Sequence, residues 1–157
     1  MPLTPSDVRT SAGSFISLSP TLPTAYTEAA YLAITDFVRV REVTDLGEYG
    51  RTYTDVTHEP LDERGVIHRK GSFDDGSIDV QMGRSASDAG QQLLQEAVLS
   101  DNSYTIMITL QDGTRQFYTG QVHSNRTGVG SLNSITTRTA TIMFDSGSGI
   151  EVLPAAA

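Results

Sequence analysis

The residues that could carry out catalysis are few and lie far apart in this sequence. Its three histidines, His58, His68 and His123, form neither an HxH nor an HxxxH pair, so their spacing does not predict a metal site. The absence of cysteine excludes thiolate metal ligands, disulfides and a cysteine nucleophile. Serines are plentiful, but none stands in a G-x-S-x-G motif that would expose it as a nucleophile.

Neighbouring carboxylates and glycine pairs do not predict chemistry either. Asp62-Glu63 and Asp74-Asp75 could form general acid–base pairs, but both flank glycines in an acidic stretch, as solvated turns do. Gly128-Val129-Gly130 and Gly147-Ser148-Gly149 are too short for a phosphate-binding loop. We therefore expect a structural or binding protein that is not an enzyme and has no cofactor and no metal.

Length and charge narrow the class of protein further. The 157 residues suit a single domain, residues 1–157, with a net charge of -8 and one lysine, Lys70. DNA binding needs clustered Lys and Arg, so this charge argues against an ordinary nucleic-acid binder. No apolar run approaches the roughly 20 residues of a membrane helix, and the N-terminus lacks a signal pattern. We expect a soluble protein with no membrane partner.

The elements that must position any functional residues are mainly strands. The alternating run Tyr104–Leu110 and the run Arg115–His123 flank Asp112-Gly113, which favours a hairpin with a two-residue type I′ turn. Gly120 leaves room for another backbone to approach. Because a two-stranded ribbon is only marginally stable alone, something has to cover this hairpin. Further strands are expected at residues 15–18, 35–43, 77–82 and 135–144, with a weak helical turn within 25–33.

One clear helix is predicted from Ser87 to Leu99, with Ser87 as its N-cap and one apolar stripe. Its length of about 20 Å is close to the roughly 24 Å of the Tyr104–Leu110 strand, so we expect it to cover one side of the hairpin. The other side, with Tyr118 and Gly120, would meet the core or a neighbouring subunit. The elements together predict a mainly β protein (α+β), a β-sandwich or open barrel flanked by an α-helix.

Three segments lie outside this pattern. Residues 1–14 lack large apolar side chains and are interpreted as a flexible N-terminal arm, and residues 146–157 as a C-terminal tail. Residues 44–76 have no dominant periodicity, and seven acids lie between positions 42 and 63 against Arg51 alone. This long inter-strand segment is either a solvated loop or an extended hairpin that becomes ordered on meeting a partner subunit. Residues 124–131 are expected to form another loop.

The order of strand, helix, hairpin and threonine-rich strand over residues 36–145 resembles the major tail tube proteins of long-tailed bacteriophages, such as that of phage lambda. The resemblance rests on Lys70–Val80, Gly90-Gln91-Gln92, Tyr104–Ile106, Phe117–Val122 and Ile135–Thr139. It implies the tail-tube fold and hexameric rings that stack into a hollow tube, which conducts DNA into the host. The sequence has no tryptophan and no large C-terminal immunoglobulin-like domain, so decoration by such a domain is not expected.

The resemblance also implies a place and partners: the virion tail, with assembly in the host cytoplasm. The implied partners are further copies of the chain, the tail tip or baseplate, tape measure and tail terminator proteins, and double-stranded DNA that passes through the lumen without specific binding. An acidic lumen would repel phosphate, and Glu42 and Asp79 are the candidate lumen-facing acids. With residues 44–76 as an assembly loop, the candidate inter-subunit contacts are Tyr49, Tyr53, Val66, Ile67 and Tyr118.

Two alternatives remain open. A related ring-forming baseplate, distal tail or secretion tube protein would form rings that do not extend into long tubes. A non-enzymatic β module that binds carbohydrate or protein would be a stable monomer with an exposed aromatic groove. The tyrosines available for such a groove are Tyr26, Tyr31, Tyr49 and Tyr53.

Overall fold

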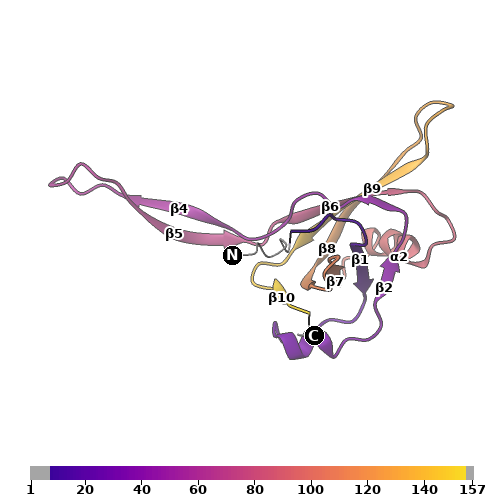
Figure 1. Cartoon of the computed structure of the whole chain (residues 1–157), viewed down its shortest axis with the longest axis horizontal. Helices are drawn as coiled ribbons and strands as arrows, with labels where there is room; N and C mark the ends of the chain where they lie inside the picture. Colours follow the sequence, from indigo (N-terminus) through magenta and orange to yellow (C-terminus); the bar gives the residue numbers. More distant parts are fainter. Residues whose placement is uncertain (1–7, 155–157) are drawn as a thin grey trace, which may run out of the picture.

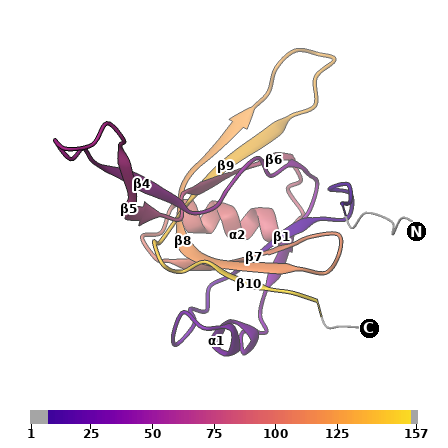
Figure 2. The same cartoon turned by 60° about the vertical axis from the view of Figure 1, so that its left-hand side comes forward.

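The body of the molecule is one curled antiparallel sheet that wraps around a helix, and two hairpins project from it (Figures 1 and 2). A computed structural model describes residues 8–154. The sheet has eight strands in the order β2-β1-β7-β8-β9-β6-β3, with β10 paired to β8. The predicted mainly β class with one flanking helix is confirmed. Half of the predicted N-terminal arm, residues 1–7, and the last residues of the C-terminal tail, 155–157, lie outside the described residues.

The strands of the body are short except for β8. They are β1 (Phe15–Ser19), β2 (Val38–Val40), β3 (Val43–Asp45), β6 (Ser77–Gly83), β7 (Tyr104–Thr109), β8 (Arg115–Gly128), β9 (Thr137–Phe144) and β10 (Ile150–Val152). The helices are α1 (Glu28–Leu32) and α2 (Ala89–Val98), and a separate two-stranded sheet consists of β4 (Thr52–His58) and β5 (Ile67–Asp74). The strands expected near residues 15, 77 and 135 and the helical turn are thus present.

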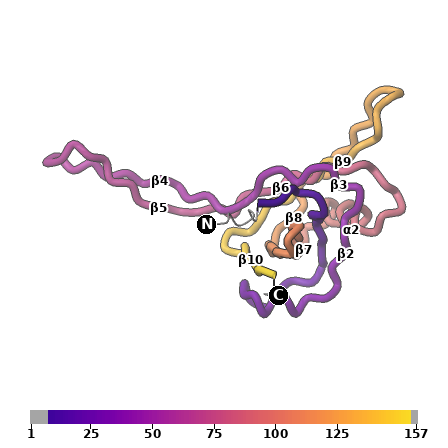
Figure 3. Tube along the Cα trace, in the orientation of Figure 1, coloured from indigo at the N-terminus to yellow at the C-terminus, as the bar shows by residue number. Residues whose placement is uncertain are grey.

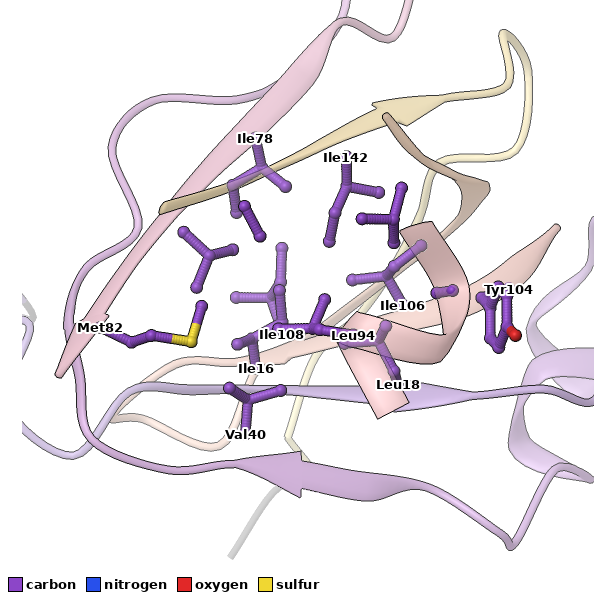
Figure 4. Close-up of a cluster of buried hydrophobic side chains, with 14 of the residues drawn as sticks. Ile16, Leu18, Val40, Ile78, Met82, Leu94, Tyr104, Ile106, Ile108 and Ile142 are labelled. Atoms are coloured by element: carbon purple, nitrogen blue, oxygen red, sulfur yellow. The ribbon is translucent and has the colours of Figure 1, made fainter. Parts of the chain in front are cut away.

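The main core lies between α2 and the face of the sheet that we call the inner face. Alternate residues of each strand point inward, as the period of two requires, so Ile78, Val80 and Met82 of β6 are buried while Asp79 and Gln81 are exposed. From the helix, Leu94 and Ala97 complete the contact (Figure 4). The other buried members are Ile16, Leu18, Val40, Tyr104, Ile106, Ile108, Val122, Ala140, Ile142 and Phe144.

The strand predicted over residues 35–43 is present only as β2, Val38–Val40, because the chain turns a corner after it. Arg41 and Glu42 separate β2 from β3, and Glu42 has a φ of 61°, a left-handed conformation that no strand accommodates. The corner sends β2 to one edge of the sheet and β3 to the other (Figure 3). Glu42 therefore lies in a corner and not on a strand, as its candidate role in the lumen had assumed.

The N-terminus of α2 packs against this corner. Asp88, and not the predicted Ser87, is the N-cap: its Oδ2 accepts hydrogen bonds from Gln91 N (3.0 Å) and from Arg41 N (3.1 Å). The bond to Arg41 ties the cap to the corner, which local sequence could not reveal. A Cβ at Gly90 would lie 2.3 Å from the carbonyl oxygen of Arg39, so glycine is required for this close approach.

The buried side chain of Gln91 closes a seam between the β2–β3 corner and the end of β6. Its Nε2 donates to the carbonyl oxygens of Arg41 (3.1 Å) and Gly83 (2.9 Å), and its Oε1 accepts from Ser85 N (2.9 Å). Gly83 N donates directly to the carbonyl oxygen of Glu42 at 2.9 Å. These bonds satisfy backbone groups that would otherwise be buried without partners at the ends of β2 and β6.

The β7–β8 hairpin exists, but its turn differs from the predicted type I′ turn. Leu110 N donates to Thr114 O, which leaves a three-residue loop in which Gly113 has a φ of 92° and no other residue has a positive φ. The side chain of Asp112 accepts from Thr114 N at 2.9 Å and holds this geometry. The close backbone approach predicted at Gly120 is confirmed, because a Cβ there would lie 2.0 Å from Met143 O of β9.

The hairpin is covered on both sides, but Tyr118 and Gly120 lie on the inner face with α2 and not on the opposite side as predicted. On the inner face α2 packs against β8, while Phe117 faces the outer side, where a smaller cluster forms under α1 with Ile150 and Val152 of β10. Within that cluster the ring of Tyr31 stacks on Phe117 with a centroid distance of 5.2 Å.

We predict that Gln91→Leu, which keeps the volume but removes all three hydrogen bonds, lowers the free energy of unfolding by roughly 2–4 kcal/mol. The cause is the loss of partners for two carbonyl oxygens and one N–H at the seam. The control Gln92→Leu removes one exposed bond to Ala86 O and should cost only about 0.5 kcal/mol. Denaturant unfolding measures both, and equal losses would contradict the assignment of the seam.

Candidate assembly surfaces

The described residues contain no arrangement that resembles a catalytic centre. No group of three or more His, Asp or Glu within residues 8–154 could hold a metal ion. Nor do the four tyrosines form a groove: Tyr31 is fully buried and donates to Ser148 O at 2.7 Å, and Tyr49 is half-buried and donates to Gln116 Oε1. The candidate functional features are surfaces on which no other element of the described chain packs.

Neither helix in the described part of the chain is long and apolar enough to span a membrane.

The first uncovered feature is a long hairpin, the β4–β5 arm, which extends away from the body (Figure 1). Its strands pair from Thr52↔Asp74 to His58↔Ile67, and every residue of β4 is exposed. The extended-hairpin interpretation of residues 44–76 is thus confirmed, whereas ordering by a partner stays a prediction. A two-stranded ribbon is marginal alone, so the arm needs a partner surface. Its exposed large apolar side chains are Tyr53, Val56, Leu61, Val66 and Phe73.

An ion pair fixes the base of this arm to the body. Arg51 Nε donates to Asp75 Oδ1 at 2.7 Å, and the guanidinium lies over the Phe73 ring, 4.2 Å from its centroid. Asp75 is almost fully buried, and its Oδ2 accepts from the N–H groups of Gly147 (2.9 Å) and Gly149 (3.1 Å). One carboxylate therefore joins the arm to the turn between β9 and β10.

Electrostatics favour the charged form of the Arg51–Asp75 ion pair, which we call the latch. Burial alone would raise the pKa of Asp75, but the hydrogen bond from Arg51, the N–H groups of Gly149 and Gly147, and the positive charge of Arg51 lower it below its ordinary value. Donating this hydrogen bond to Asp75 also raises the pKa of Arg51. Asp75 thus remains a carboxylate in spite of its burial.

A second hairpin projects where β8 and β9 run beyond the body (Figure 2). β8 continues as strand to Gly128, paired with Thr137 of β9, so the loop expected at residues 124–131 is wrong in its first half. A register shift between Val122 and Ser124 bends β8 as it leaves the core. The run Ser124–Gly128 is polar and lacks the alternation of apolar and polar residues that predicts a strand. This part of β8 was therefore not predicted. Three exposed side chains lie at the far end: Val129 (66%), Leu132 (98%) and Ile135 (80%).

The outer face of the sheet is half covered and half bare. Over β7, β10 and the first part of β8 it lies under α1 and the segment that follows α1, but β3, β6, β9 and the middle of β8 have no such cover. The bare half is mostly polar, and on it Thr141 Oγ1 donates to Asp79 Oδ1 at 2.7 Å. Its outward residues are Asp45, Asp79, Gln81, Gln121, Ser124, Arg126, Thr137, Thr139, Thr141 and Met143, of which Arg126 is the one basic residue.

The candidate lumen acids have different positions. Asp79 lies on the bare outer face, whereas Glu42 lies at the β2–β3 corner, exposed. Asp45, which the sequence placed within a loop, is on β3 opposite Gln81 and shares the outer face with Asp79. The sequence pattern could not predict β3, because this strand has only three residues and follows a left-handed corner.

The candidate contact residues also divide into two groups. Tyr53, Val66 and Ile67 belong to the β4–β5 arm, with Tyr53 and Val66 exposed. Tyr49 and Tyr118 instead pack edge to face within the subunit, 6.0 Å between centroids. Tyr118 also stacks on the Phe144 ring at 4.2 Å. Most of the surface of these two tyrosines is used inside the chain.

Comparison with known proteins identifies the fold. No protein-family model and no curated protein matches the sequence. Among solved structures, a chain of the 6-fold symmetrised baseplate of the anti-feeding prophage matches with a TM-score of 0.67 and 11% identity, over 94% of this chain and 97% of that one. The SPP1 tail tube matches with a TM-score of 0.66 and 13% identity, over 91% and 78%. The tail of a GTA particle with C6 symmetry matches with a TM-score of 0.63 and 12% identity, over 94% and 100%.

The chain has the tail-tube fold. The resemblance inferred from the order of elements is therefore confirmed at the level of the fold. The three matched chains come from a baseplate, a tail tube and the tail of a GTA particle. Identities of 11–13% leave the assembly and the partners of this chain to be argued from its own surfaces.

We predict that Arg51→Leu lets the β4–β5 arm adopt a wider range of orientations relative to the body. Because the chain has no cysteine, Leu61→Cys and Leu99→Cys place one spin label on the arm and one beside α2. The distance distribution between the labels should broaden in Arg51→Leu. The control Arg69→Leu, within the arm, should leave the distribution narrow, and an unchanged width in Arg51→Leu would contradict the latch.

The latch also predicts a pH dependence. The lowered pKa of Asp75 means that its carboxylate stabilises the fold above its ordinary pKa of about 4, and that the stabilisation disappears as the pH falls through the lowered value. Asp75→Asn should therefore lose most stability relative to wild type near neutral pH, with the difference shrinking in acid. Denaturant unfolding over a pH series measures it. A difference that does not change with pH would refute this role.

Proposed function

We propose that this chain is the subunit of a phage-like tail tube, in which hexameric rings stack around a channel that conducts double-stranded DNA. The observation that carries the proposal is the bare outer half-face of β3, β6, β9 and β8. An antiparallel sheet can keep a polar face in contact with water, and in a ring such a face would form the wettable wall of the channel. The shared fold with the SPP1 tail tube and the C6-symmetric GTA tail supports this arrangement.

The charge of the proposed wall suits passage of DNA. Asp79 and Asp45 point from the bare outer face, and the Thr141 hydroxyl bonded to Asp79 adds a polar group without positive charge. Carboxylates repel phosphate, while clustered Lys and Arg would retain the polymer through counterion release. Of the acidic residues in the chain, we assign Asp79 and Asp45 to the lumen, and Glu42 would lie at the rim of the ring.

The uncovered edges and arms suit contacts between copies. β3 is the end strand of the sheet, and an exposed edge is protected when an adjacent subunit pairs with it in a closed ring. The β4–β5 arm, with Tyr53, Val66 and Ile67, would lie on a neighbouring subunit. Tyr49 and Tyr118 would contribute only their remaining exposed edges. The proposed partners beyond the tube are the tail tip or baseplate, tape measure and tail terminator proteins of the same virion.

A second candidate function is a ring-forming baseplate component. The specific observation in its favour is the match to the anti-feeding prophage baseplate, over 94% of this chain. Such a protein would use the same lateral contacts between subunits but would stop after one or two rings.

Deletion of the β4–β5 arm tests whether the arm is needed for tube formation. We predict that purified wild-type protein forms hollow tubes in negative-stain microscopy, and that deleting residues 53–73 leaves folded protein that forms no tubes. This deletion keeps Arg51, Asp75 and the core contacts of Tyr49, so the body should unfold at a similar temperature. Isolated wild-type rings would favour the baseplate function, and a strict monomer at high concentration in all salts would contradict both.

A further inference from the structure

A polar cleft at the far end of the body gathers two arginines. It lies where α2 meets the ends of β6 and β9, with a volume of about 230 Å³, and it is lined by Arg84, Ser85, Ala86, Gln91, Gln92, Gln95 and Arg138. No acidic side chain lines it. In a chain with a net charge of -8, a cleft of this composition is the natural place for a carboxylate from elsewhere.

The two arginines have no acidic partner within the described residues. The only ion pairs among residues 8–154 are Arg51–Asp75 and His68–Asp55. Arg138 Nε is moreover buried without any hydrogen-bond partner in that part of the chain. A guanidinium nitrogen that is removed from water and unpaired costs free energy, so an acceptor placed in the cleft would relieve that cost.

Acidic groups without partners occur at the tip of the β4–β5 arm, residues 59–66. Glu59, Asp62 and Glu63 stand there against Arg64, all exposed, and the backbone turns through a bond from Glu63 N to Pro60 O. Leu61 at the same tip is fully exposed. The tip thus has a net negative charge and an apolar side chain, and its carboxylates take no part in the ion pairs of the described residues.

The tip and the cleft lie at opposite ends of one ladder, so they cannot meet within a chain. The arm leads into Ser77, which pairs with Met143 at one end of β6, while the cleft lies beyond Gly83↔Thr137 at the other end. In Figure 1 the arm accordingly points away from α2. A contact between two such sites is head-to-tail, and a contact of this kind repeats along an axis when its rotation does not close into a ring.

We propose that the acidic tip of the β4–β5 arm docks into the Arg84–Arg138 cleft of a second copy of this chain, where its carboxylates pair with the two guanidinium groups. The contact is the axial link of the proposed tube and to that extent rests on the proposed function. Arginine suits it because its planar donors can hold a carboxylate with two parallel hydrogen bonds.

A charge swap tests the docking. Glu59→Lys with Glu63→Lys should raise the protein concentration needed for tube formation at least about tenfold, since it opposes like charges at the contact. Arg84→Glu should do the same, and the three substitutions together should restore most of the loss. The control Arg126→Glu, on the outer face opposite Thr139, should not be rescued by the tip substitutions. Tubes that form equally well with the reversed tip would overturn the docking while leaving the tube function intact.

Disulfide cross-linking tests the contact between tip and cleft even in protein that has not formed tubes. In the cysteine-free chain, Leu61→Cys and Ala86→Cys are made in separate proteins, mixed and oxidised, and a disulfide forms only where the Cα atoms approach within about 7 Å. We expect a cross-linked dimer from this mixture but not from Leu61→Cys with Gln81→Cys on the outer face. A cross-linked dimer in the absence of any tubes would support the docking and count against the tube. No dimer from assembled tubes would overturn the docking alone.

Discussion

The side-chain amide of Gln91 joins the helix to the β2–β3 corner and to the end of β6, and the shape of the molecule depends on that junction. An antiparallel sheet of eight strands exposes two edges and two faces, and water or protein has to satisfy each of them. The Arg41-Glu42 corner brings the edges together, Asp88 and Gly90 let the helix approach, and Gln91 occupies the remaining gap. The inner face is thereby sealed, and the apolar core can form behind it.

What the seam does not cover becomes the surface available for assembly. One half of the outer face is covered by α1 and the segment that follows it, and the other half stays polar and bare. The two hairpins carry exposed apolar groups that no element of the same chain covers. Arg51 and Asp75 hold one of these hairpins in a defined direction, so its conformational freedom is restricted before any partner arrives. A preorganised arm loses less entropy on binding than a free one.

The sequence predicted those features that depend on local periodicity. Alternation located β6, β7 and β9 and their buried faces, and the apolar stripe located α2 to within two residues of each end. Gly120 was correctly interpreted as a point of close backbone approach. The order of the elements was sufficient to indicate the tail-tube fold, because topology persists when identity falls to 11–13%.

The failures have a common cause in contacts between residues far apart in sequence. The side chain of Asp88 caps α2 and also accepts a hydrogen bond from Arg41 N, next to the left-handed Glu42. Because Asp88 and Glu42 are 46 positions apart, a pattern of neighbouring residues could predict neither the cap nor the corner. The second hairpin was missed because strands paired only with each other need no apolar alternation. Tyr49 and Tyr118 looked like surface aromatics until folding placed their rings in contact.

A cryo-EM reconstruction of the assembled protein would show whether the bare outer half-face lines a channel. We expect a six-fold ring in which β3, β6, β9 and the middle of β8 form the inner wall, with Asp79 and Asp45 pointing into the lumen. A reconstruction in which this face lies on the outside of the particle, or is buried between subunits, would show that it lines no channel.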